Sequence, residues 1–274
     1  MNLLANLVCI IILLCSVLII IPSSSVHAAY DDRKVDCSKN PPAGDEQGKV
    51  HQIASLCAYF SGKPHSKKPA VILLSDVWGY GVPKLRKFAD KVASAGNFVV
   101  VPDLFFGDPT TNTTQKEVWL AKHRPEEAVK YVKPLIQALK EKGVHKIGAA
   151  GFCWGGKVVV ELAKEADIIP VAALLHPSYT TIDDIKGVKV PMALLVGERD
   201  NGTPPEYVKE STAALKANQV DYFVKVYPGM PHGWTIRYKD DIPAQKKYSE
   251  EACQDLVDWF GKHLKKIHSA KRFV

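Results

Sequence analysis

The stretch Lys146-Ile-Gly-Ala-Ala-Gly151-Phe-Cys153-Trp-Gly-Gly156 decides the fold of this chain. Its apolar first half predicts a buried strand over Lys146–Gly151, and helical periodicity begins near Gly155. Between them stands the small-x-nucleophile-x-small pattern of a nucleophile elbow, in which the flanking glycines let strand and helix approach each other closely. Cys153 is therefore the candidate nucleophile, and a helix N-terminus beside its sulfur favours the thiolate.

Two other interpretations of this turn are weaker. A lone cysteine is usually a buried structural residue, but one flanked by glycines after a strand is not typical of that role. The glycines followed by Lys157 also match the first part of a phosphate-binding loop. However, Val158 stands where a hydroxyl residue should hold magnesium, so we expect no nucleotide site at this turn.

The chain around the elbow alternates short apolar runs with helix-period segments. Strands are expected at Ala70–Leu74, Phe98–Pro102, Lys146–Gly151, Val171–Leu175, Met192–Val196 and Asp221–Tyr227. Helices are expected at Pro83–Ala95, Glu126–Glu141, Gly155–Ala166, Glu206–Ala217 and Ala244–Lys266. Such alternation predicts an α/β fold, here of the α/β-hydrolase type, with a mostly parallel central sheet and helices on both faces. One domain over residues 70–274 is the simplest account, and residues 29–69 form an N-terminal segment packed on it, with a strand pair around Lys49 to Phe60.

A nucleophile elbow predicts an acid and then a histidine, each in a loop after a later strand. Asp200 follows the apolar run Met192–Val196, and His232 lies in a Gly- and Pro-flanked loop after the next run. The candidate triad is thus Cys153, Asp200 and His232, with the imidazole moving protons and the carboxylate orienting it. The backbone N–H groups of Trp154 and Val77 are the candidate oxyanion hole.

The irregular stretch from Leu104 to Pro125 is long for a loop in a compact domain. A wall or lid over the site is one interpretation, and a surface excursion is the other. It contains Asn112-Thr113-Thr114, in which Asn112 is a possible glycosylation site.

The N-terminal residues 1–28 predict a secretory signal peptide. The run Leu3–Ile21 is almost wholly apolar, and Val26-His27-Ala28 suits cleavage near Ala28. An uncleaved signal anchor is the alternative, because the run nearly reaches the length that spans a bilayer. We expect a secreted protein without a membrane segment after cleavage.

The net charge of +7 lies wholly beyond the signal segment. Its lysines are scattered, which indicates a solvated basic surface and no nucleic-acid module. Of the four cysteines beyond residue 28, Cys37 and Cys57 are a possible disulfide, and pairing of Cys253 with an N-terminal cysteine is the alternative.

Several motifs make residues 50–266 resemble the dienelactone hydrolase family of α/β-hydrolases. They are Ser75-Asp-Val-Trp-Gly-Tyr80, Val101-Pro-Asp-Leu-Phe105, Gly151-Phe-Cys-Trp-Gly-Gly156 and His232-Gly-Trp-Thr-Ile-Arg237. The start Cys37-Ser-Lys-Asn-Pro-Pro42 is similar to that of a secreted plant branch often labelled endo-1,3;1,4-β-D-glucanase.

This resemblance implies a Cys-Asp-His triad that hydrolyses an ester, lactone or thioester through an acyl-enzyme, with no metal and no cofactor. It implies that Asp76 helps to generate the thiolate and that Arg237 binds substrate. The family also has a second substrate-binding arginine after the Pro-Asp-Leu motif. That arginine is missing in this sequence, where Gly107 lies near its position. Trp78, Tyr80, Phe105 and Trp234 complete the candidate substrate-binding residues.

Two other functions stay open. One is a glucanase acting on cell-wall glycan, although glycoside hydrolysis normally needs two facing carboxyl groups. The other is a non-catalytic glycan-binding protein on a hydrolase scaffold. The expected partner is a small-molecule or cell-wall-derived substrate, with no nucleic acid, and the chain is expected to be a monomer, with a dimer as the alternative.

Overall fold

The structure is a computed structural model that describes residues 35–39, 44–66 and 68–266. All of these belong to one compact unit, Lys34–Val274. The signal peptide expected over residues 1–28, and residues 40–42 of the N-terminal motif, lie outside the described residues. Within the described ranges, none of the helices has the length and hydropathy needed to cross a bilayer.

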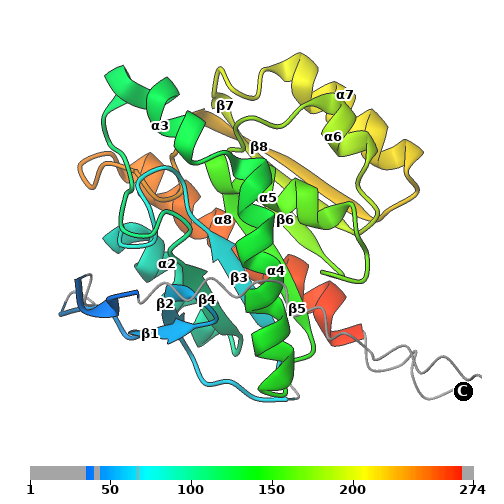
Figure 1. The fold of residues 1–274 in the computed structure, drawn as a ribbon. Coiled ribbons are helices and arrows are strands. Elements are labelled where there is room, and N and C mark those ends of the chain that lie inside the picture. The colour runs from blue at the N-terminus through cyan, green and yellow to red at the C-terminus, as the bar shows by residue number, and fades with distance from the viewer. Residues whose placement is uncertain (1–34, 40–43, 67, 267–274) are drawn as a thin grey trace, which may run out of the picture. The chain divides into compact units, whose positions relative to one another are not determined.

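A central eight-stranded sheet organises the unit (Figure 1). Its order is β1 (Lys49–Ile53), β2 (Leu56–Ser61), β4 (Phe98–Pro102), β3 (Ala70–Leu74), β5 (Ile147–Phe152), β6 (Ala172–Leu175), β7 (Met192–Arg199) and β8 (Tyr222–Pro231). The β1–β2 and β2–β4 pairs are antiparallel, and every pair from β4 to β8 is parallel. The strands β3 to β6 are buried along their whole length because helices cover both faces. The predicted fold is confirmed.

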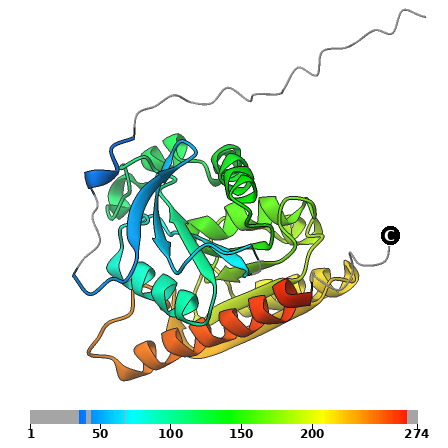
Figure 2. The ribbon, with the colours of Figure 1, turned by 90° about the horizontal axis from the view of Figure 1, so that it is seen from below.

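The helices form a layer on each side of the sheet (Figures 1 and 2). On one face α2 (Pro83–Ser94) and α8 (Pro243–Lys266) pack in a single apolar cluster with the strands. A second cluster buries residues of α4 (Pro125–Glu141), α5 (Trp154–Ala163), α6 (Ile182–Lys186) and α7 (Pro205–Ala217) on the opposite face. The short elements η1 (Cys37–Lys39), η2 (Thr113–Gln115) and α3 (Lys116–Lys122) complete the chain.

Two differences from the sequence-based expectation concern the site. The stretch after Leu104 contains the short helix α3, whose seven residues are too few for a clear helical period. The strand β8 continues to Pro231 because β7 runs on to Arg199 around an irregularity after Gly197. Prolines are tolerated in β8 because it is an edge strand, where one side makes no ladder.

The N-terminal segment is tied into the domain by more than β1 and β2. Cys37 and Cys57 form a disulfide, whereas Cys253 is a free, buried thiol. The buried Arg86 of α2 pairs with Glu46 at 3.1 Å. These contacts hold the segment against β2 and α2.

Candidate active site

The nucleophile elbow is as sharp as the sequence suggested. Cys153 caps α5 with φ 50° and ψ −110°, a strained conformation for a residue with a side chain. A Cβ on Gly151 would lie 2.2 Å from the Gly155 carbonyl oxygen, and one on Gly155 would lie 2.3 Å from the Leu74 carbonyl oxygen. Both positions therefore require glycine, and the turn holds the sulfur at the carboxyl end of the sheet.

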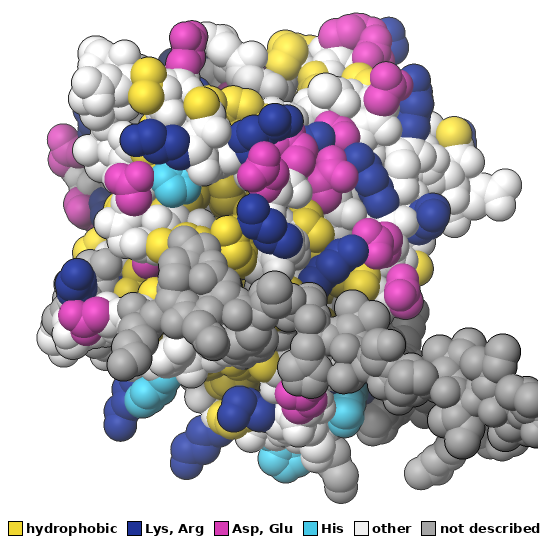
Figure 3. All heavy atoms as spheres, in the orientation of Figure 1, with side chains coloured by type: hydrophobic (Ala, Val, Ile, Leu, Met, Phe, Trp, Pro, Cys, Tyr) yellow, Lys and Arg dark blue, Asp and Glu magenta, His cyan; other side chains and the backbone are white. Residues whose placement is uncertain are grey.

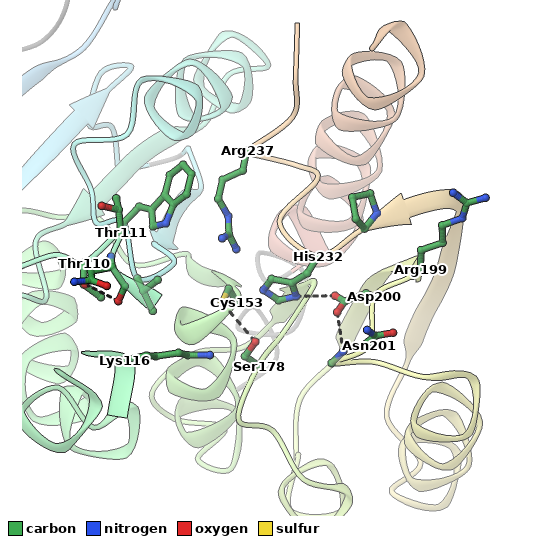
Figure 4. A pocket seen from close by; sticks show the side chains of 15 residues that line it. Thr110, Thr111, Lys116, Cys153, Ser178, Arg199, Asp200, Asn201, His232 and Arg237 are labelled. Carbon is green, nitrogen blue, oxygen red and sulfur yellow. Dashed lines mark hydrogen bonds and ion pairs between the residues drawn. The ribbon is translucent and has the colours of Figure 1, made fainter. Parts of the chain in front are cut away.

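The predicted partners of Cys153, Asp200 and His232, lie beside it at this end of the sheet (Figure 4). Asp200 follows β7, and its Oδ2 lies 2.8 Å from His232 Nδ1. The Gly202 N–H donates to the other carboxylate oxygen at 2.8 Å. Asp200 is 3% exposed, so its carboxylate is held by these two contacts away from bulk water. The imidazole of His232 lies beside the Cys153 sulfur and acts on its ionisation.

The ionisation of this cluster favours a charged pair. Burial disfavours the thiolate, but the neighbouring His232 outweighs it and lowers the pKa of the Cys153 thiol. Burial likewise disfavours the imidazolium, but Asp200 and then Cys153 raise the pKa of His232 to about 9. A thiolate beside an imidazolium is the reactive form of a cysteine nucleophile.

A further side chain touches the sulfur. Ser178 Oγ lies 3.5 Å from Cys153 Sγ, and the Ser178 N–H donates to the Cys153 carbonyl oxygen at 2.9 Å. This hydroxyl also lowers the pKa of the thiol. Sequence analysis did not identify Ser178, although its place just beyond a buried parallel strand was a usable signal.

Asp76 and Arg237 form an ion pair beside the sulfur. Arg237 Nε lies 2.9 Å from Asp76 Oδ2, and the Trp78 N–H donates to Asp76 Oδ1 at 3.0 Å. Burial raises the pKa of Asp76, although Arg237 opposes this. These contacts hold Arg237 and the oxyanion loop, and the negative charge of Asp76 by itself raises the pKa of the Cys153 thiol.

Trp78 and Gly233 both contact the Arg237 side chain and position it. Its guanidinium carbon lies 5.0 Å from the centre of the Trp78 ring, a cation–π contact. A Cβ on Gly233 would lie 2.4 Å from Arg237 Nε, so the glycine after His232 leaves room for the arginine.

The two candidate oxyanion donors come from the loop after β3 and from the first turn of α5. Trp154 is the first residue of α5, so its N–H has no intrahelical acceptor. Val77 lines the cavity, and its carbonyl oxygen accepts a hydrogen bond from the Thr110 N–H at 2.8 Å, which ties the oxyanion loop to the 104–125 stretch.

These groups open into a cavity of about 530 Å³. Its lining consists of Val77, Trp78, Thr110, Thr111, Asn112, Lys116, Cys153, Ser178, Arg199, Asp200, Asn201, Gly202, Pro231, His232 and Arg237. The stretch from Leu104 to Pro125 therefore supplies one wall, including the exposed Asn112. Within the described ranges, no group of three or more His, Cys, Asp or Glu residues is arranged to hold a metal ion.

Lys116 brings a positive charge to the wall opposite Arg237 (Figure 4). Its ammonium lies 5.3 Å from the Tyr179 ring centre, and the neighbouring Tyr179 raises the pKa of the lysine. The sequence offered no signal for Lys116 among so many scattered lysines.

Three of the aromatic residues that were expected to bind substrate lie in the protein core instead. Tyr80, Phe105 and Trp234 are at most 4% exposed and do not line this cavity. Phe105 packs edge-on against Trp154 at 4.7 Å between ring centres. Of the expected set, Arg237 and Trp78 line the cavity, and the other three belong to the core.

His176 supports the loop that carries His232. It is fully buried, its Nε2 lies 2.5 Å from Thr235 Oγ1, and its ring centre lies 5.1 Å from that of His232. Burial lowers the pKa of His176 well below the usual range, so a neutral ring packs against the imidazolium.

Comparison with known proteins agrees with this architecture. The family model for the dienelactone hydrolase family matches residues 56–264. A Zea mays protein named endo-1,3;1,4-beta-D-glucanase is 39% identical over 214 residues, 75% of this chain and 69% of that protein. A Mus musculus carboxymethylenebutenolidase homolog is 31% identical and covers 78% of this chain and 90% of its own.

Among solved structures, a putative dienelactone hydrolase from Klebsiella pneumoniae superimposes with a TM-score of 0.67 at 20% identity. The match covers 76% of this chain and 93% of that one. At this identity the likeness bears on the fold alone.

Proposed function

The chain belongs to the dienelactone hydrolase family, and from this premise we propose that Cys153, Asp200 and His232 hydrolyse an ester or lactone through an acyl-enzyme. The observation that carries the proposal is the Asp200–His232 contact of 2.8 Å beside a cysteine whose pKa His232 lowers. This arrangement prepares a nucleophile and a proton donor together.

In the first half-reaction the Cys153 thiolate attacks the substrate carbonyl carbon and forms a carbon–sulfur bond. The carbonyl electrons move to oxygen, where the N–H groups of Val77 and Trp154 stabilise the oxyanion. The intermediate collapses with cleavage of the carbon–oxygen bond, and His232 gives its proton to the departing alkoxide. Water then attacks the thioester with His232 as base, and the carboxylic acid and the cysteine are released.

The cavity suits acyl transfer better than glycoside hydrolysis. Asp200 is the sole acidic residue in its described lining, and Asp200 is occupied by His232 and the Gly202 N–H. Glycoside hydrolysis normally uses two carboxyl groups across the scissile bond. The name of the Zea mays relative keeps a glucanase as the second candidate, and direct assay separates the two.

The charge of the cavity favours substrates with an anionic group. Arg237 is paired with Asp76, whereas Lys116 contacts the ring of Tyr179. The second substrate-binding arginine that the resemblance implies near Gly107 is missing. Lys116, at the start of α3, supplies a positive charge to the cavity instead. We propose that it binds a carboxylate or similar group of the acyl substrate.

The test compares two substrates on matched variants. We expect the wild-type protein to hydrolyse 4-nitrophenyl butyrate and to show a butyryl mass adduct on Cys153 after rapid acid quench. Cys153→Ala removes both signals, and Cys253→Ala, which changes the other free thiol, retains them. Release of reducing ends from mixed-linkage β-glucan that survives Cys153→Ala would support the glucanase instead.

We also propose that the protein follows the secretory pathway. Support comes from the apolar N-terminal segment and from the Cys37–Cys57 disulfide, since disulfides persist in oxidising compartments. Asn112 is exposed at the wall of the cavity, so a glycan on it would stand beside the entrance. Intact mass before and after enzymatic deglycosylation, with Asn112→Gln as the control, tests both points.

A further inference from the structure

A second cavity, of about 500 Å³, lies away from the nucleophile. It is lined by Gln47, Gly48, Lys49, His51, Gln52, Ile53, Phe60, Gly62, Lys63, Pro64, Phe98, Leu139, Lys142 and Val144. Phe98 begins β4 and Val144 precedes β5, so this cavity lies at the amino ends of the parallel strands. The nucleophile and its partners lie at the carboxyl ends, so the two cavities are separate sites.

The floor of this cavity is aromatic and apolar. In β1 the side chains of Lys49, His51 and Ile53 share one face, and Phe60 is the β2 partner of Lys49. The ring of Phe60 stacks on Phe98 with 5.8 Å between centres, and His51 lies 6.1 Å from Phe60. Helix α4 covers the neighbouring part of this face but ends at Glu141, which leaves Phe60 half-buried.

The rim is positively charged. Lys49, Lys63 and Lys142 are exposed, and within the described part of the chain none of them makes an ion pair. The described lining contains no Asp or Glu. In Figure 3 dark-blue and cyan side chains border hydrophobic surface at the lower edge of the molecule, below the grey band.

We propose that this cavity is a binding site for a small aromatic carboxylate. An aromatic ring fits against Phe60 and His51 because flat rings stack at such distances. The carboxylate meets the ammonium groups of Lys63 and Lys142, whose charges have no competing acid in the cavity. The volume lies within the range of small-ligand sites. A neutral sugar would gain nothing from the lysines, and a cation would be repelled by them.

The experiment measures binding of 2-naphthoate to the purified protein by isothermal titration calorimetry. Its neutral isostere 2-naphthamide is the ligand control. Cys153 is first alkylated with N-phenylmaleimide, which places a bulky group at the sulfur in the catalytic cavity. We expect the carboxylate to bind at least threefold more tightly than the amide, and Lys63→Gln combined with Lys142→Gln to weaken it about three- to tenfold.

Two single variants locate the bound probe. Lys140→Gln removes a charge from the last turn of α4, two residues before Lys142 but outside the cavity lining, where its ammonium contacts the Asp167 carbonyl oxygen, and should leave binding unchanged. Lys116→Gln changes the catalytic cavity and should also leave it unchanged. Equal binding of the amide, weakening by Lys116→Gln in place of the double variant, or no binding at millimolar probe overturns the proposal. None of these results depends on catalytic activity.

Discussion

Asp200→Asn tests the central electrostatic claim about the proposed triad. Asn is nearly isosteric with Asp, and its carbonyl oxygen can still accept the Gly202 N–H. Its amide, however, carries no charge and presents no second acceptor to His232 Nδ1. The substitution therefore removes stabilisation of the imidazolium while leaving the buried loop packed.

The size of the effect follows from the pKa of His232. Burial lowers it, yet Asp200 and then Cys153 raise it to about 9, about 2.5 units above 6.5. Asp200 is the largest raising contribution, so its loss should lower the pKa by about one to two units, or about 1.4–2.7 kcal/mol. That corresponds to a fall of about 10- to 100-fold in kcat/KM at alkaline pH, above both pKa values, and to a much smaller fall near neutral pH, where the imidazolium is still populated.

The assay is the pH dependence of kcat/KM for 4-nitrophenyl butyrate. In the wild-type protein activity should rise as Cys153 ionises below its ordinary thiol range, and fall as His232 loses its proton near pH 9. In Asp200→Asn the alkaline limb should move one to two units toward lower pH. Glu198→Gln is the matched control. Glu198 is exposed and does not line the cavity, and its carboxylate accepts a hydrogen bond from the Gly229 N–H. An unmoved alkaline limb with full activity would refute the reasoning.

Three further predictions address the surroundings. Ser178→Ala should raise the pKa of the Cys153 thiol and slow its alkylation by iodoacetamide at pH 6–7 by about three- to tenfold; an unchanged rate would mean that the hydroxyl does not act on the sulfur. Lys116→Gln should lower kcat/KM for 4-nitrophenyl hemisuccinate about three- to fivefold and leave the acetate ester unaffected; equal effects on both esters would argue against carboxylate binding. Replacing Cys37 and Cys57 together by Ser should lower the free energy of unfolding in urea by about 3 kcal/mol, since the bridge spans 20 residues; equal stability with and without the bridge would contradict this.

Much of the fold could be predicted from local pattern. Buried parallel strands are continuous apolar runs, and Ala70–Leu74, Phe98–Pro102 and the start of β7 were predicted at their observed positions. The extension of β8 to Pro231 was not, because it depends on pairing with a neighbouring strand across an irregularity. The short helices α3 and α6 were missed because one or two turns leave too little periodicity.

Some residues of the site could likewise be predicted from the sequence, and others could not. Chain order predicted that Asp200 and His232 lie together, and they do, because an acid and a histidine that follow successive strands meet at the carboxyl edge of a parallel sheet. Aromatic character identified Tyr80, Phe105 and Trp234 as substrate-binding candidates, and the structure instead buries them. The sequence does not distinguish an aromatic residue of the core from one that lines a cavity, because both are apolar.

The sequence by itself determined the elbow and the order of its partners. The sharp turn at Cys153 requires glycine before and after it for steric reasons that involve only adjacent strand and helix. Only the tertiary structure decided what surrounds the sulfur, namely Ser178, Lys116 and the pairing of Arg237 with Asp76. These contacts join loops far apart in the chain, and their geometry depends on how the sheet and helices pack, which no local pattern encodes.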